Sequence, residues 1–424
     1  MQRHFLRLTA ATAALGVAVA LAGCGAPGEA GAVTLNLIAA DYDVNGGQSS
    51  RTYWDDVVHK FEATHDGINV EVHIEPWTSI DRKVAQLVKR DQAPDIAQIG
   101  AYADYAADDK LYSADELLSI PVQSNFLAPL VAAGKQRRVQ YGLPFTASTR
   151  LLFYNKDHFK KAGIAKPPQT WEELSEAARL LKANTKVSYP IALPLGPEEA
   201  QAETMVWLLG AGTDGYVDAG GVYAIDSDEN TSALEWLKSD LVDQKLTGPV
   251  APGKLNRKEA FAAFTRGEVG MLNGHPSLMK SARAAGVDVG MVTMPGRAGR
   301  SNSTMGVADW IMGFKQNGHQ AEIGDFLNFL FTDENVLNFA AQNALLPVTT
   351  SASEAMEDDA QHADLKPFLD ELPESVLPPV DKTSWATVSD EVKRNIGNAV
   401  KPGGSPRQVL EDIAQKATEA EQRE

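Results

Sequence analysis

The stretch that decides the fold class spans residues 33–100 and opens with Val33-Thr34-Leu35-Asn36-Leu37-Ile38. This opening is rich in branched apolar residues, which favour a buried strand. Residues 69–74 alternate between apolar and polar side chains like a second strand, and a third short strand follows near the end of the stretch. The segments 53–61 and 80–89 between them have helical spacing. Strands alternating with helices predict right-handed crossovers in a parallel sheet and therefore an α/β fold.

The length of the chain, 424 residues, is too great for a single hydrophobic core, so two lobes are expected. The run Leu151-Leu152-Phe153-Tyr154 predicts a strand that crosses from one lobe to the other, and Gly306–Ile311 predicts a strand that returns. Thr170 and Glu173 have the spacing of a capping box that begins a helix. The expected boundaries are 33–144 plus about 306–350 for lobe 1, and 145–305 plus about 351–424 for lobe 2.

The N-terminus has the three parts of an export signal: basic residues at Arg3 and Arg7, an uncharged apolar run at 8–22, and small residues before Cys24. The apolar run is shorter than the roughly 18 residues that a spanning helix needs. Cys24 is the only cysteine, so it cannot form a disulfide within the chain. We expect a signal peptide at 1–23; an ordinary signal with a chance cysteine is the alternative.

The segment that ends in Leu21-Ala22-Gly23-Cys24 resembles a bacterial lipobox. This resemblance implies cleavage before Cys24 and acyl chains on its sulfur, which would anchor the protein to the membrane without spanning it. The small, polar residues 24–32 are expected to form the linker between the anchor and the folded body.

The net charge of the chain is −17, with the acidic residues spread along the sequence. Nucleic-acid binding requires a basic patch, so the composition argues against nucleic acid as a partner. The same charge disfavours electrostatic steering of anionic ligands.

Three groups of short motifs lie along the chain. The first is at residues 141–145, 152–156, 159–164 and 167–174, the second at 261–264, 267–271 and 273–274, and the third at 326–330 and 345–348. Together they resemble the extracellular solute-binding proteins of ABC importers, in particular the maltose-binding-like sugar group. The resemblance implies a periplasmic-binding-protein-like fold, in which a ligand cleft lies between two α/β lobes. It also implies a monomer that holds a carbohydrate and delivers it to permease subunits in the membrane, outside the cytoplasm.

Candidate ligand-binding residues lie in loops at the carboxyl ends of the expected strands, where α/β lobes place their sites. A carbohydrate presents hydroxyl groups and weakly apolar ring faces, so carboxylates, amides and aromatic rings are the side chains that suit it. Core packing is the competing interpretation for each aromatic ring. The candidates are Asp41, Tyr42, Asp43, Trp77, Tyr102, Asp309 and Trp310, with Trp207 and Asn273 from the second lobe.

Several motifs match catalytic or cofactor patterns in letters but not in context. Residues 210–215 match GxGxxG, yet a helix precedes them, so a helix C-terminus and loop is expected. The phosphate-loop skeleton at 248–254 contains two prolines and lacks the following Ser or Thr. A calcium loop starting at Asp41 has Thr52 where a bidentate Glu is needed. No zinc spacing or nucleophile–base set stands out, so no cofactor, metal site or catalytic residue is expected.

Two other functions remain open. The same fold could bind a non-sugar solute such as a glycerol phosphate ester or a peptide, for which Arg150 and Arg300 are the candidate cations. An exported glycoside-active enzyme would need two carboxylates roughly 5–10 Å apart, and the sequence contains no recognisable pair.

Overall fold

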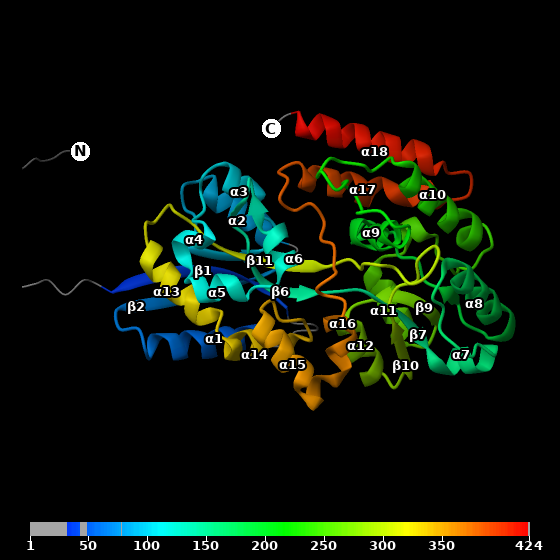
Figure 1. Ribbon diagram of the computed structural model, residues 1–424, viewed down its shortest axis with the longest axis horizontal. Coiled ribbons are helices and arrows are strands. Elements are labelled where there is room, and N and C mark those ends of the chain that lie inside the picture. The colour runs from blue at the N-terminus through cyan, green and yellow to red at the C-terminus, as the bar shows by residue number, and fades with distance from the viewer. Residues whose placement is uncertain (1–31, 43–48, 78, 423–424) are drawn as a thin grey trace, which may run out of the picture.

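The computed structural model describes residues 32–42, 49–77 and 79–422 (Figure 1). The signal peptide expected at 1–23, Cys24, the linker up to residue 31 and Asp43 lie outside the described residues. Within the described residues, no helix is both long enough and apolar enough to cross a membrane.

A five-stranded sheet forms the first lobe, in the order β2-β1-β3-β11-β6. β1 pairs in parallel with β2 and β3, which confirms the alternation of strands and helices expected over 33–100. β11 runs antiparallel to β3 and β6, as a strand returning from the other lobe must do here. The strands are β1 (Val33–Asp41), β2 (Ile68–Pro76), β3 (Ile96–Ile99), β6 (Leu143–Ser148) and β11 (Val307–Gly313).

Helices cover this sheet on both sides (Figure 1). The first two connect the parallel strands, and α13 and α14 follow β11 as a consecutive helix pair. A short hairpin, β4 (Lys135–Gln136) and β5 (Val139–Gln140), follows α6. The helices are α1 (Ser49–Glu62), α2 (Ile80–Val88), α3 (Ala103–Ala107), α4 (Ala114–Leu117), α5 (Ile120–Asn125), α6 (Ala128–Ala133), α13 (Gln320–Leu330) and α14 (Asp333–Asn343).

The second lobe is built on a four-stranded sheet in the order β10-β7-β9-β8. β7 is antiparallel to both neighbours, and β8 is parallel to β9. The strands are β7 (Leu151–Asn155), β8 (Tyr189–Ile191), β9 (Val269–Gly274) and β10 (Val289–Val292). The helices are α7 (Lys156–Ala162), α8 (Trp171–Asn184), α9 (Ala200–Gly210), α10 (Asp228–Trp236), α11 (Arg257–Thr265), α12 (Pro276–Ala284), α17 (Trp385–Val400) and α18 (Pro406–Glu421).

Local signals in the sequence set several helix boundaries. Thr170 and Glu173 form the predicted capping box, because the Thr170 side chain accepts from the Glu173 amide and the Glu173 carboxylate accepts from the Thr170 amide. Gly210 ends α9, which confirms the helix terminus expected in place of a dinucleotide motif. α10 continues directly into a π-helical turn, Leu237–Val242.

Three chain segments run side by side between the sheets (Figure 1). β6 stays in the first sheet through Ser148, so the chain crosses at Thr149 and Arg150, later than the expected end of the first segment at residue 144. The Thr304 hydroxyl donates to the Arg150 carbonyl at 2.7 Å, and the Val376 amide donates to the Thr304 carbonyl at 2.9 Å. These bonds tie the connecting segments together at the crossing.

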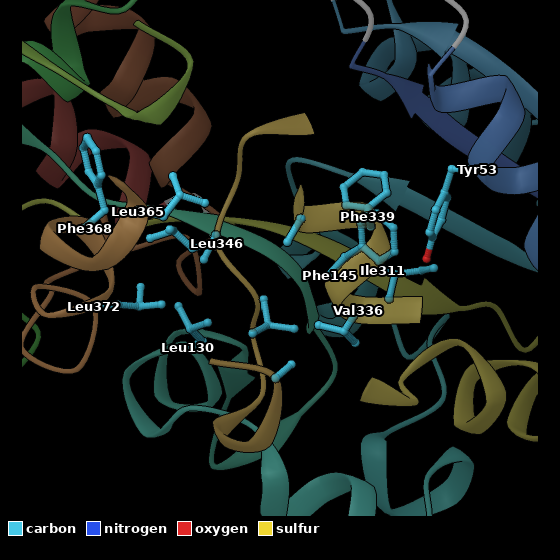
Figure 2. Close-up of a cluster of buried hydrophobic side chains, with 14 of the residues drawn as sticks. Tyr53, Leu130, Phe145, Ile311, Val336, Phe339, Leu346, Leu365, Phe368 and Leu372 are labelled. Atoms are coloured by element: carbon cyan, nitrogen blue, oxygen red, sulfur yellow. The ribbon is translucent and has the colours of Figure 1, made fainter. Parts of the chain in front are cut away.

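A hydrophobic cluster extends from the first lobe to the connecting segments (Figure 2). Phe145 of β6 lies 4.5 Å from Phe339 of α14 between ring centroids, and Tyr53 packs on the same Phe339 ring at 4.8 Å. Phe368, from α16 (Lys366–Leu369), belongs to the same cluster, while α15 (Thr350–Asp358) connects α14 to it. The packed cluster fixes β6 and β11 where they approach the second lobe.

Candidate functional site

Strand register places three polar residues next to the crossing between the sheets. Asp309 of β11 pairs with Thr146, near the end of β6. Arg150 lies between β6 and β7, and Asn273 of β9 pairs with Leu152 at the start of β7. Polar residues of both lobes therefore lie close to the crossing.

In the first lobe, a chain of hydrogen bonds positions Asp309. The Ala40 amide donates to Gln98 Oε1 at 2.8 Å, and Gln98 Nε2 donates to the Tyr42 hydroxyl at 2.8 Å. The Tyr42 hydroxyl in turn donates to Asp309 Oδ2 at 2.7 Å. One oxygen of the carboxylate is thus held in place by the fold.

Burial raises the pKa of Asp309 from 3.8 to about 7, although the bond from Tyr42 acts in the opposite direction. The negative charges of Asp81, on α2, and Glu199, beside the N-terminus of α9, raise the pKa further. Asp309 belongs to the first lobe and Glu199 to the second. The two carboxylates are therefore close enough across the lobes for their charges to interact.

An aromatic ring lies beside this carboxylate. Trp77, directly after β2, makes an edge-to-face contact with Tyr42, with ring centroids 5.4 Å apart. Phe339 supports Tyr42 at 5.0 Å. Trp77 is only half-buried, so part of its indole remains free to pack on a ligand.

The second lobe contributes a charged cluster made of Arg150, Glu199, Glu203, Arg257 and Asn273. Glu203 and Asn273 are 1% and 2% exposed, and Asn273 Nδ2 donates to Glu203 Oε2. Arg257 pairs with Glu199 at 3.5 Å. Burial raises the pKa of Glu203 to about 7, even though Arg257 and Arg150 act to lower it.

Burial also shifts the pKa values of Arg150 and of the neighbouring His275. Burial, reinforced by the charge of Arg257, lowers the pKa of Arg150 to about 10. Burial also holds the pKa of His275 well below 6.5, with Arg150 and Arg257 acting in the same direction. His275 is therefore uncharged at neutral pH, and the cationic groups of this cluster are the two guanidinium groups.

Three of the predicted aromatic ligands are buried and pack against other aromatic rings. Tyr102 and Trp310 are 0% exposed and pack on each other with ring centroids 5.4 Å apart. The Tyr102 hydroxyl donates to the Ala133 carbonyl at 2.5 Å. Trp207 is 1% exposed and packs against Trp171 and Trp236. None of these three rings presents an exposed face in this structure.

The remaining candidate ligand-binding residues are Asp41, Asn273 and Asp43. Asp41 is half-buried at the end of β1, next to Tyr42, and Asn273 is buried beside Glu203. Asp43 lies outside the described residues.

Sequence reasoning missed Gln98 and Glu203, although each carried a signal. Gln98 is a polar residue inside the apolar strand Ile96–Ile99. Glu203 is the one charged residue of the otherwise uncharged helix Ala200–Gly210. Buried polar groups require partners, so a charge within an apolar segment points to a polar cluster.

Two hollows of about 570 and 380 Å³ lie elsewhere on the described surface, one between α4 and α13 and the other between α17 and α18. Neither hollow is lined by residues of the Gln98–Tyr42–Asp309 chain or of the charged cluster in the second lobe. Within the described part of the chain, no three His, Cys, Asp or Glu side chains are placed to hold a metal ion.

Comparison with known proteins agrees with this arrangement. Residues 46–337 match the family model of the bacterial extracellular solute-binding proteins. A binding protein of Brucella abortus is 27% identical over 392 residues, which cover 90% of this chain and 92% of that protein. The sn-glycerol-3-phosphate-binding periplasmic protein UgpB of Brucella melitensis is 27% identical over 249 residues, 55% of this chain and 54% of that protein.

Among solved structures, the cyclic alpha-maltosyl-1,6-maltose binding protein of Arthrobacter globiformis superposes with a TM-score of 0.78 at 19% identity. The match covers 93% of this chain and all of that chain. The protein therefore belongs to the family of bacterial extracellular solute-binding proteins and has their two-lobe α/β fold.

Proposed function

We propose that this solute-binding protein captures a carbohydrate between its lobes and delivers it to the permease of an ABC importer. The observation that carries the proposal is the Gln98–Tyr42–Asp309 chain of hydrogen bonds beside the half-buried ring of Trp77. A carboxylate held in one orientation suits a sugar hydroxyl, and an indole face suits the apolar face of a sugar ring. The structural neighbour from Arthrobacter globiformis is named as a binding protein for cyclic alpha-maltosyl-1,6-maltose, which supports a carbohydrate as the solute.

A glycerol phosphate ester is the second candidate solute, since the relative UgpB is named as an sn-glycerol-3-phosphate-binding protein. Arg150 and Arg257 are the cations that would meet the phosphate. Four carboxylates, at Asp81, Glu199, Glu203 and Asp309, surround the same region and oppose a dianion. The excess of negative charge favours the neutral carbohydrate.

The remaining features of the proposal concern how the protein works in the cell. Cleavage before Cys24 and acylation of its sulfur would tether the protein to the outer face of the membrane, near its permease. A short tether raises the local concentration of the binding protein. We propose that it acts as a monomer, without catalysis or a cofactor, and that its two lobes, joined at the crossing after Ser148, close on the solute.

The test is binding of glucose, maltose, maltotriose and trehalose to the purified chain, measured by calorimetry and by the shift of the melting temperature. A bound sugar raises the melting temperature by linkage. Trp77→Ala should weaken the best sugar at least about tenfold, because stacking on an aromatic face is lost. Trp385→Ala is the matched control, since Trp385 is a half-buried tryptophan that packs on Tyr216.

Failure of all four sugars to bind, with sn-glycerol 3-phosphate binding instead, would overturn the carbohydrate proposal. Turnover of a glycoside would show that the protein is an enzyme.

A further inference from the structure

Among the buried polar atoms of the described structure that have no hydrogen-bond partner, two acceptor oxygens belong to one hydrogen-bonded pair of side chains in the second lobe. They are Glu203 Oε1 and Asn273 Oδ1. The other atoms of the two groups bond to each other, because Asn273 Nδ2 donates to Glu203 Oε2. Most buried polar atoms in proteins are partnered, so two orphans on one bonded pair require an explanation.

The orphan oxygens belong to side chains at the edge where the lobes meet. Asn273 is the next-to-last residue of β9, and its register with Leu152 places it beside the crossing segment. Glu203 lies in the first turn of α9, whose N-terminus carries Glu199. Glu199 interacts electrostatically with Asp309 of the first lobe. The two orphan acceptors therefore lie in the second lobe close to the proposed binding site.

Nearby cations do not satisfy these oxygens. Arg257 pairs with Glu199, and the one hydrogen bond described for the Arg150 guanidinium goes to the Ser148 hydroxyl at 3.2 Å. Both guanidinium groups lie close enough to Glu203 to lower its pKa, yet burial outweighs them and raises it. The carboxylate thus stays desolvated and short of donors.

We infer that Glu203 Oε1 and Asn273 Oδ1 form an acceptor pair that selects solutes presenting hydrogen-bond donors and rejects groups that can only accept. This inference rests on the proposed function and narrows its solute class to polyols whose hydroxyl groups enter the second lobe. A hydroxyl group donates to such an acceptor. The dianion of a phosphate ester has no proton on its phosphate group to donate, and the dianions of the ester and of inorganic phosphate both repel the carboxylate. Leaving buried acceptors unpaired makes the wrong solute bind far more weakly.

The same arrangement has a consequence for stability that needs no ligand. At pH 8 the Glu203 carboxylate is mostly ionised, and its raised pKa means that folding disfavours this charged form. Glu203→Gln removes the charge while it keeps the shape and an oxygen for Asn273 Nδ2. The variant should melt a few degrees higher than the natural protein at pH 8. A purely structural Glu203 would give a lower melting temperature on replacement.

The experiment compares the natural chain with Glu203→Gln at pH 8. Calorimetry measures the affinity for the best sugar of the panel, for sn-glycerol 3-phosphate and for inorganic phosphate. The natural chain should bind the sugar at least about 100-fold more tightly than either phosphate probe. Glu203→Gln should lose at least about tenfold for the sugar and gain affinity for the phosphate probes. Glu176→Gln is the control, because Glu176 is an exposed carboxylate of the same lobe paired with Arg179.

The outcomes separate this inference from the proposed function. Sugar binding that is unchanged in Glu203→Gln would contradict the acceptor pair and leave the carbohydrate proposal intact. A lower melting temperature for the variant at pH 8 would also contradict it. Binding of a phosphate probe as tightly as any sugar would contradict the inference, and binding of no sugar would overturn both.

Discussion

At the scale of single residues, Asp309 and Trp310 are neighbours on β11 with opposite environments. Successive side chains of a strand point to opposite faces, and a register shift against β6 separates these two. Asp309 faces Tyr42 and the second lobe, while Trp310 packs on Tyr102 in the core. The sequence identified the pair but could not assign the faces, because the face depends on the tertiary position of the strand.

This difference predicts distinct losses for two tryptophans. Trp310→Ala should destabilise the protein by about 3–5 kcal/mol, since it leaves a cavity in place of a fully buried ring. Trp77→Ala should cost far less stability, because Trp77 is only half-buried. Urea unfolding followed by circular dichroism measures both values. Equal losses for the two variants would show that Trp310 is not a core residue.

At the scale of elements, periodic segments were predictable and the way they meet was not. The strands of residues 33–100 and the capping box at Thr170 follow from local patterns. The π-helical turn Leu237–Val242 was missed, because its hydrophobic period differs little from that of an α-helix over six residues. The crossing after Ser148 was misplaced because β6 and β7 are almost continuous in sequence.

The crossing segments supply a prediction at this scale. Gly306 lies against Ser375, so that a Cβ at Gly306 would meet Ser375 Oγ at 2.6 Å. Gly306→Ala should therefore destabilise the chain by about 1–3 kcal/mol through overpacking. Gly299→Ala is the control, since a methyl group on its Cα would meet no heavy atom within 4 Å and the residue precedes the same connecting segment. Matching urea midpoints for the two variants would contradict close packing at the crossing.

At the scale of the whole molecule, the α/β class and the two-lobe fold were predicted correctly, because alternating elements and chain length leave few architectures. The charge interactions between the lobes could not be predicted from the sequence. Asp309 and Glu199 repel each other across the lobes, whereas Asp81 of α2 is attracted to Lys393 of α17. Residues this far apart in the chain are brought together only by tertiary structure.

These interactions predict that acid favours closure of the lobes. Opening would hydrate Asp309 and remove it from Glu199, so its pKa would fall from about 7 toward 3.8. The closed form then binds more protons than the open form between these values. Closure is consequently strengthened as the pH falls below about 7 and weakened as the pH rises through 7. X-ray scattering should give the sugar-free chain a smaller radius of gyration at pH 6 than at pH 8. Asp309→Asn should remove most of this difference and hold the smaller radius at both pH values, because its amide carries no charge to repel Glu199. A pH response that persists in full in Asp309→Asn would assign the effect to other groups.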